Sequence, residues 1–97
     1  MTAIIDFNPT DKVIEFGGGD KPLYHPNIDT RWHKNVDIVA NLNYPVPVSD
    51  CEYNGVYSRY AIEHISWRNV RVLIREMWRV LRPGGMSIVI TANLLNQ

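Results

Sequence analysis

The sequence predicts an α/β domain built on a mainly parallel sheet. Short apolar segments recur along the chain, and one of them, Lys12–Phe16, runs directly into three glycines. A single long amphipathic segment, Trp67–Arg82, lies between two further apolar segments. A strand–helix–strand order favours parallel pairing, because parallel strands need a crossover of a dozen or more residues between them.

The chain length and composition predict one globular domain over residues 1–97. Apolar residues make up 45% and charged residues 21% of the 97 residues, which is typical of a folded domain rather than a disordered one. Ten Lys and Arg balance ten Asp and Glu, so the formal net charge is zero. Whole-domain electrostatic binding to nucleic acid is therefore not expected.

The cysteine, histidine and leader patterns predict a cytoplasmic protein without a metal site. Cys51 is alone and cannot form an internal disulfide, which favours a reducing compartment. His25, His33, His64 and Cys51 lack the spacing of metal ligands. The first residues do not have the pattern of a signal peptide, and no apolar run approaches the ~20 residues of a membrane span.

The first half of the chain is expected to hold three short strands. The first is Lys12–Phe16, followed by weaker segments at Asn27–Thr30 and Val36–Ala40. Two prolines interrupt the first connection, and the second is too short for a helical crossover. The helices on this side are therefore expected to be reduced.

The second half predicts a strand at Tyr53–Tyr60, a helix at Trp67–Arg82 and a final strand at Met86–Thr91. Ser66 is the expected N-cap, and Pro83–Gly85 would end the helix. Apolar residues recur at helical spacing and are expected to form the buried face: Val70, Leu73, Ile74, Met77, Trp78 and Leu81.

Five arginines at helical spacing are expected to form a stripe opposite that face: Arg68, Arg71, Arg75, Arg79 and Arg82. The ordinary interpretation is a solvated helix surface. The alternative is a local contact with a phosphate or an acidic partner.

Two features of the first half point to a ligand at the carboxyl ends of the strands. Glu15 precedes Gly17–Gly19 at the end of the first strand, where glycines allow a ligand to approach the backbone closely. A tight turn is the alternative explanation of these glycines. Pro22 stands where a dinucleotide fingerprint has its third glycine, which argues against NAD. Asp29, closing the second strand, is either a ribose ligand or an ordinary surface residue.

Four motifs in order give the chain a family resemblance. The chain resembles the class I S-adenosylmethionine-dependent methyltransferases in these four motifs. They are Val13–Gly19, Asp29, Glu63-His64-Ile65 and the Arg79–Gly85 turn. The resemblance covers roughly Lys12–Thr91. It implies a Rossmann-like sheet of about five strands in the order 3-2-1-4-5, with one long helix between the last two strands.

The resemblance also implies a cofactor site for S-adenosylmethionine. Its residues would be Glu15, Gly17, Gly18, Gly19, Asp29, Asn41, Leu42, Ser58 and Tyr60. Glu15 would hold the ammonium group of the cofactor, and Asp29 the ribose hydroxyls. His64 would lie toward the substrate and is the candidate base, since its free pKa lies near neutrality. The alternative is that His64 caps or packs at the start of the long helix.

The chain departs from the family in several places. Lys21 stands at the usual third glycine, Asn41 and Asn54 replace aspartates, and the last two strands have no counterpart after Thr91. The resemblance implies methyl transfer to an unidentified acceptor by a domain truncated after strand five. A non-catalytic cofactor-binding or protein-interaction module is the alternative, and a piece of a longer enzyme is a third interpretation.

The truncation predicts an exposed sheet edge at Met86–Thr91. This segment is apolar, uncharged and free of proline, so it lacks the usual protection of an edge strand. We therefore expect a homodimer, or pairing with a partner chain, through Met86–Gln97.

Overall fold

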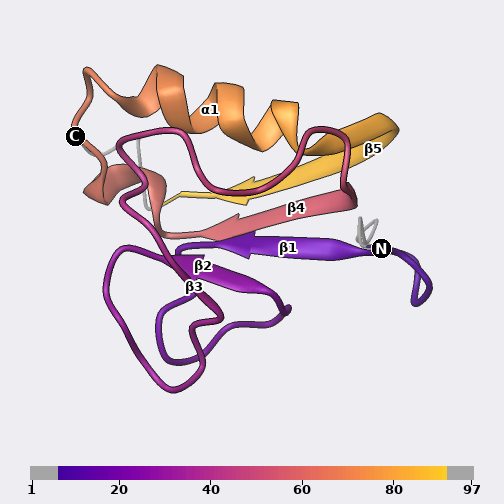
Figure 1. Ribbon diagram of the computed structural model, residues 1–97, viewed down its shortest axis with the longest axis horizontal. Helices are drawn as coiled ribbons and strands as arrows, with labels where there is room; N and C mark the ends of the chain where they lie inside the picture. Colours follow the sequence, from indigo (N-terminus) through magenta and orange to yellow (C-terminus); the bar gives the residue numbers. More distant parts are fainter. Residues whose placement is uncertain (1–6, 92–97) are drawn as a thin grey trace, which may run out of the picture.

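The computed structural model describes residues 7–91. The chain forms five strands, a short 3-10 helix and one α-helix (Figure 1). In chain order they are β1 (Val13–Phe16), β2 (Asn27–Asp29), β3 (Ile38–Val39), β4 (Tyr53–Arg59), η1 (Ile62–His64), α1 (Val70–Arg79) and β5 (Leu81–Ile90). The expected association segment extends to Gln97, and its part from 92 to 97 lies outside the described residues.

The five strands form one sheet in the order β3-β2-β1-β4-β5, and every neighbouring pair is parallel. The predicted fold class and strand order are confirmed. β1 lies at the centre, and all four of its residues are buried. A strand covered on both faces is mostly apolar, and β1 is apolar except for Glu15, which explains why the Lys12–Phe16 segment carries a clear signal.

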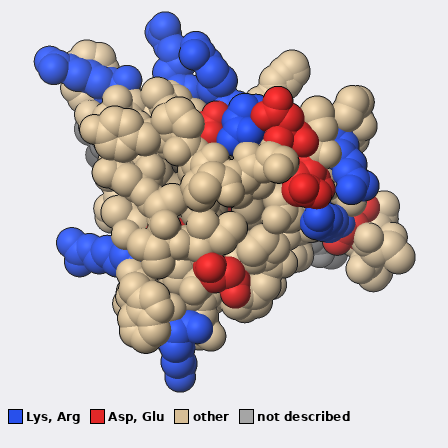
Figure 2. Space-filling view, in the orientation of Figure 1, with Lys and Arg blue, Asp and Glu red and all other residues tan. Residues whose placement is uncertain are grey.

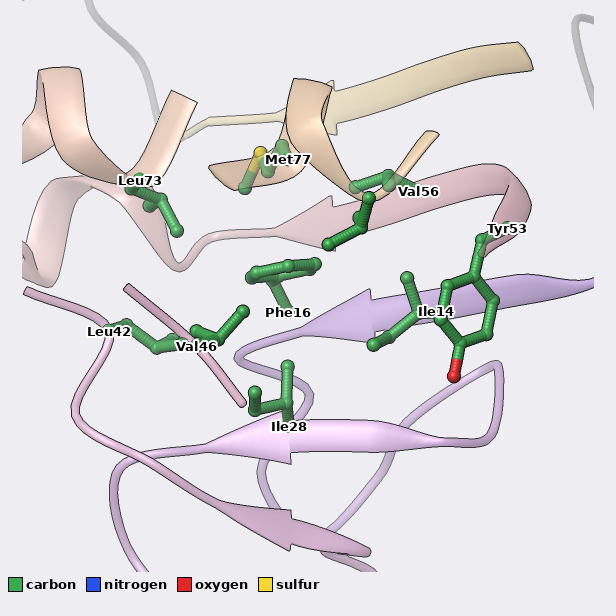
Figure 3. Close-up of a cluster of buried hydrophobic side chains, with 10 residues drawn as sticks. Ile14, Phe16, Ile28, Leu42, Val46, Tyr53, Val56, Leu73 and Met77 are labelled. Carbon is green, nitrogen blue, oxygen red and sulfur yellow. The ribbon is translucent and has the colours of Figure 1, made fainter. Parts of the chain in front are cut away.

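One face of the sheet is covered by α1 and by the loop that follows β3. Leu73, Met77 and Val80 are almost fully buried against the sheet. Leu42 and Val46 from the loop close the same core beside Ile28 and Phe16 (Figure 3). This apolar layer is the main hydrophobic core of the domain.

The helix is shorter than predicted, beginning at Val70 rather than Trp67 and ending at Arg79 rather than Arg82. Ser66 does not act as the N-cap. Its carbonyl accepts the N–H groups of Asn69 and Val70 in a turn, and Asn69 takes the cap position without a side-chain capping hydrogen bond.

β5 begins earlier than predicted, because Leu81 already pairs with Tyr53. The register then shifts, and regular pairing resumes with Met86 opposite Gly55. The Pro83–Gly85 turn is therefore an irregularity inside the strand rather than a separate connection.

The predicted buried face of the helix is partly wrong. Trp78 is 67% exposed and Ile74 is 45% exposed. The buried side chains of α1 are Leu73, Glu76 and Met77. Successive helical residues are rotated by about 100°. Positions 74 and 78 consequently lie to one side of the narrow stripe that faces the sheet.

Arg79 departs from the predicted solvated stripe. Its guanidinium donates to Glu76 at 2.8 Å, to the Val48 carbonyl at 2.7 Å and to Asp50 at 2.6 Å. Glu76, 5% exposed, also accepts the Val46 N–H at 2.7 Å. The hydrogen bond from Arg79 is the main reason that the pKa of Glu76 lies below its usual value. This pair ties α1 to the loop before β4.

The opposite face of the sheet is covered without a helix. Between β1 and β3 the described chain contains β2 and otherwise only turns and loops, which confirms the prediction of reduced helices. The Tyr24 ring packs edge-on against Phe7 and Tyr57, with centroid distances of 5.4 and 5.3 Å. A side chain at Gly55 would collide with the Phe7 ring. The missing Cβ therefore makes room for an aromatic cover.

Candidate functional site

A hollow of about 530 Å³ lies where β1, β2 and β4 end. Its wall is formed by nine residues, which are the last residue of β2 and residues of the segments that follow β1, β2, β3 and β4. They are Gly17, Asp29, Thr30, Arg31, Leu42, Asn43, Tyr60, Ala61 and His64. The carboxyl edge of an open parallel sheet is the usual position of a ligand site.

The glycine turn after β1 is required by the fold itself. Gly17 and Gly19 have φ values of +78° and +60°, in the left-handed region that favours glycine. A Cβ at Gly17 would lie 2.5 Å from that of Ala61, and one at Gly18 would lie 2.5 Å from the Asn27 amide oxygen. Turn geometry thus explains all three glycines. Among them, Gly17 also lines the hollow.

The Asp29 carboxylate is held at the edge of the hollow by backbone groups. One oxygen accepts the Gly19 N–H at 2.8 Å, and the other accepts the Thr30 N–H at 2.6 Å. A carboxylate has about four acceptor positions, so both oxygens keep capacity for a ligand. Because the side chain is already oriented, little rotamer entropy would be lost when a ligand binds.

The wall formed by the loop after β3 combines an apolar and an amide side chain. Leu42 is 3% exposed and belongs to the core as well as to the hollow. Asn43 lines the hollow, whereas the predicted Asn41 does not. The Asn41 side-chain oxygen accepts both the N–H and the amide NH₂ of Asn43 at 3.0 Å. Asn41 therefore orients the residue that lines the hollow.

The segment after β4 forms the remaining wall. Tyr60 has a φ of +58°, and its N–H donates to the Ile90 carbonyl at 2.7 Å. His64 lies in η1, and its side chain is exposed at the rim of the hollow. α1 begins only at Val70, so His64 does not cap that helix.

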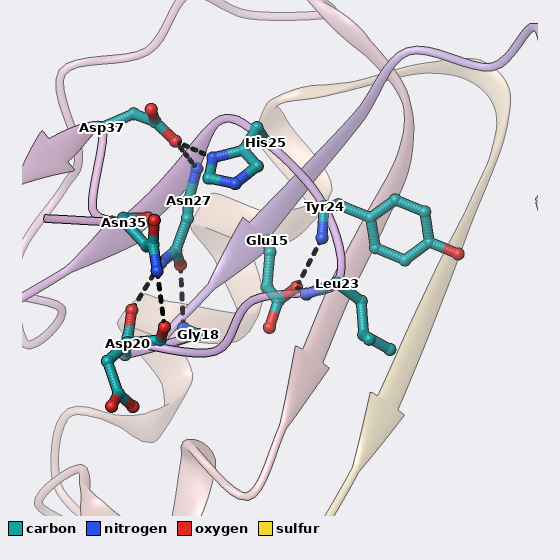
Figure 4. Close-up of polar contacts among 10 residues, drawn as sticks. Glu15, Gly18, Asp20, Leu23, Tyr24, His25, Asn27, Asn35 and Asp37 are labelled. Carbon is teal, nitrogen blue, oxygen red and sulfur yellow. Dashed lines mark hydrogen bonds and ion pairs between the residues drawn. The ribbon is translucent and has the colours of Figure 1, made fainter.

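Glu15 lies outside the hollow and holds the loop after β1. It is 1% exposed, and one carboxylate oxygen accepts the N–H groups of Leu23 and Tyr24 at 2.7 and 3.0 Å (Figure 4). Burial raises the pKa of Glu15, and the two backbone hydrogen bonds oppose that shift.

Ser58 also lies outside the hollow. It is fully buried in β4, and its hydroxyl oxygen has no hydrogen-bond partner among the described residues. Its role toward a cofactor, like that of Glu15, stays a prediction.

The structure brings half of the predicted site residues together. Those lining the hollow are Gly17, Asp29, Leu42, Tyr60 and His64; those outside it are Glu15, Gly18, Gly19, Asn41 and Ser58. Sequence reasoning missed Thr30, Arg31, Asn43 and Ala61. Each of the four lies one or two positions after a predicted residue in the sequence. Extending each motif by one or two residues beyond its strand would have found them.

The described residues contain no group of three or more His, Cys, Asp or Glu side chains that could hold a metal ion. Among the same residues, no helix has the length and apolar character needed to cross a membrane.

Comparison with known protein families gives a match to a methyltransferase domain over residues 23–89. The chain belongs to this methyltransferase family. The match covers most of the chain, from within the loop between β1 and β2 to β5. It begins after Gly19, so membership rests on the later strands and α1 rather than on the glycine turn.

One curated relative is the uncharacterized protein YafE of Escherichia coli (strain K12). It is 34% identical to this chain over 61 residues. The matched segment is 63% of this chain and 28% of that protein, so the chain corresponds to less than a third of its relative. No solved structure gives a significant match.

Proposed function

We propose that this domain binds S-adenosylmethionine in the hollow and transfers its methyl group to an acceptor. The observation that carries the proposal is the position of Asp29. The chain belongs to a methyltransferase family, and its Asp29 carboxylate is pre-oriented at the end of β2. This carboxylate lies on the wall of the hollow at the carboxyl edge of the sheet. This is where the ribose of a nucleoside binds in open α/β sheets.

The residues of the hollow fit such a nucleoside. Its volume of about 530 Å³ lies within the usual range of small-molecule sites, roughly 300–1,000 Å³. Asp29 has acceptor capacity for two hydroxyls, Leu42 offers an apolar surface, and Asn43 offers an amide that can donate and accept. Gly17 leaves backbone exposed to the ligand.

When bound, S-adenosylmethionine would supply a methyl group on a sulfonium sulfur, and the neutral thioether that remains after transfer is a good leaving group. The chain needs to orient the acceptor and exclude water. His64, at the rim, can take a proton from an acceptor that carries one on nitrogen or oxygen, because a neutral imidazole ring has one nitrogen that accepts a proton. His64 is therefore the proposed base.

Calorimetric titration with S-adenosylmethionine and S-adenosylhomocysteine tests the binding proposal. Asp29→Ala is expected to weaken binding by about 1–3 kcal/mol, the loss expected for hydrogen bonds to a charged group. Asp20→Ala is the matched control, because Asp20 is exposed, has the same charge and does not line the hollow. Equal affinity of the folded Asp29→Ala variant and the wild type would remove Asp29 from the site.

A second candidate function, a protein-interaction module, is favoured by the outer side of β5, which pairs with no other strand of residues 7–91. β5 pairs with β4 on one side and is the last strand in the sheet order. Val89 and Ile90 are 37% and 38% exposed. Unpaired backbone groups beside exposed apolar side chains favour pairing with another strand. We propose that a second copy of the chain pairs here as a symmetric dimer.

Sedimentation velocity at micromolar concentration tests this pairing. Val89→Lys places a charge on the edge and is expected to shift the protein to monomer. Val39→Lys is the control, because Val39 is 52% exposed on the opposite edge strand, β3. A wild-type chain that sediments as a strict monomer would contradict the proposal.

A further inference from the structure

A second, larger depression lies at the amino edge of the sheet, away from the hollow. It has a volume of about 1040 Å³ and runs between α1 and the start of β5. We call it the arginine groove. It is lined by Asp50 and Cys51, by Leu81–Gly85 and by the α1 residues Arg71, Ile74, Arg75, Glu76, Trp78 and Arg79. None of these residues lines the hollow.

The middle of the groove is apolar and open to solvent. Ile74 and Trp78 are one helical turn apart, and both are well exposed. On the opposite wall, a Cβ built at Gly84 would meet no atom within 4 Å, so the space beside Gly84 is open. A contiguous exposed apolar surface with a polar rim is typical of an interaction site.

The rim of the groove is positively charged. Arg71 and Arg75 are exposed and form no ion pair with any described residue, and Arg82 lies on the other side. Like charges four residues apart on a helix repel each other. Blue side chains project from the end of the molecule where α1 lies (Figure 2).

The acidic residues of the groove do not neutralise this rim. Asp50 and Glu76 both bond to Arg79. The groove lining thus holds two more arginines than carboxylates, in a chain whose net charge is zero.

From this combination we infer that the arginine groove binds an acidic amphipathic segment of a partner protein. Apolar side chains of the segment would cover Ile74 and Trp78, and its carboxylates would pair with Arg71, Arg75 and Arg82. Helices that place an apolar face in a groove are a common mode of recognition. Arginine forms two-pronged hydrogen bonds with carboxylates, which adds geometric specificity to the charge attraction.

Two other occupants fit the groove less well. A second copy docked by two-fold symmetry would bring two sets of unpaired arginines together, which is unfavourable. The proposed β5 dimer uses Val89 and Ile90, which do not line the groove, so the two interfaces are separate. A nucleic acid would meet the carboxylates of Asp50 and Glu76 in the groove, and it would gain little from the apolar centre.

The test uses a synthetic peptide with leucine at every third and fourth position and glutamate between them. Binding is measured by fluorescence anisotropy of the labelled peptide, beside a scrambled peptide of the same composition. Arg75→Glu and Trp78→Ala are each expected to weaken binding at least tenfold. Arg68→Glu, an exposed change outside the groove, is expected to stay within twofold of the wild type. Affinity is also expected to fall as salt increases.

Three outcomes would overturn the inference. The first is a loss of specificity. The scrambled peptide would then bind as tightly as the designed peptide, or a folded Arg75→Glu variant would bind the designed peptide as tightly as the wild type does. The second is tighter binding of labelled oligouridylate than of the peptide, with the same loss in Arg75→Glu, because the groove would then be a nucleic-acid site. The third is a change in the sedimentation of the protein alone caused by Arg75→Glu, which would assign the groove to a second copy.

Discussion

The two faces of the sheet are closed by different physical means. On one face α1 buries Leu73 and Met77 in an apolar core together with Phe16 and Val56. On the other face the loop between β1 and β2 has no helix, and side chains of the strands hold it through its backbone. The first arrangement depends on apolar area. The second combines an aromatic cover with hydrogen bonds from buried polar side chains to the loop backbone.

Asn27 shows how the second arrangement works. It is fully buried in β2 and forms three side-chain hydrogen bonds (Figure 4). It accepts the Gly18 N–H at 2.9 Å and donates to the carbonyls of Gly19 and Asn35 at 3.0 Å. Glu15 does the same for Leu23 and Tyr24. A loop can replace a covering helix only if such buried polar groups are satisfied.

The largest expected effect lies on the helix face. Leu73→Ala is expected to lower the free energy of unfolding by about 2–5 kcal/mol, because it leaves a cavity in the apolar core. Urea denaturation measures the loss. Trp78→Ala is the control and is expected to change stability by no more than about 0.5 kcal/mol, as for an exposed side chain. A larger loss for Trp78→Ala than for Leu73→Ala would reverse the assignment of the buried face.

A smaller but still large effect is expected on the loop face. Asn27→Ala removes three hydrogen bonds and is expected to cost about 2–3 kcal/mol, because it leaves three partly buried backbone groups without this partner. Asn35→Ala removes a single exposed side-chain bond and is expected to cost under about 1 kcal/mol. If both variants unfold at the same urea concentration, the loop is held by something other than Asn27.

The smallest effect is expected in the pH dependence of the free energy of unfolding, to which Glu15 on the loop face contributes. Because burial raises the pKa of Glu15 above its usual 4.5, the folded protein holds this proton more tightly than the unfolded chain does. The stability gained from the bound proton is complete below pH 4.5. It is lost as the pH rises through the folded-state pKa.

Comparison of the wild type with Glu15→Gln isolates this contribution. Relative to the variant, the wild type is expected to lose stability as the pH rises from 4.5, and thermal unfolding at several pH values measures the difference. Asp37 and Glu76, whose pKa values are lowered, act in the opposite sense, but both are present in the two proteins and cancel. A constant difference over the whole range would mean that the pKa of Glu15 is the same in the folded and unfolded chain.

The same contrast explains what could be predicted from the sequence. The parallel sheet, its strand order and the region of α1 follow from apolar periodicity and family motifs, and the structure confirms them. The buried face of α1 was only partly predictable. Periodicity groups Ile74 and Trp78 with Leu73, but it does not show how wide a stripe the sheet can cover.

The candidate site was predicted less completely, because loops form most of its wall. Asp29 is the last residue of a strand, so its position at the edge could be inferred. Asn43 enters the hollow through a local turn in which Asn41 binds its amide, and no periodic pattern reports such a turn. The family resemblance assigns Glu15 to the cofactor, whereas its observed hydrogen bonds go to the neighbouring loop.

The backbone at Tyr60 has a consequence for how this fold tolerates change. A non-glycine residue in the left-handed region is disfavoured by about 1–3 kcal/mol, and here it stands on the wall of the hollow. Glycine would relieve that strain but would remove the ring and its phenol from the wall. Folding stability and the shape of the hollow therefore make opposite demands on one position. Selection for thermostability alone would act against this tyrosine, whereas selection for a ligand that contacts its ring would retain it.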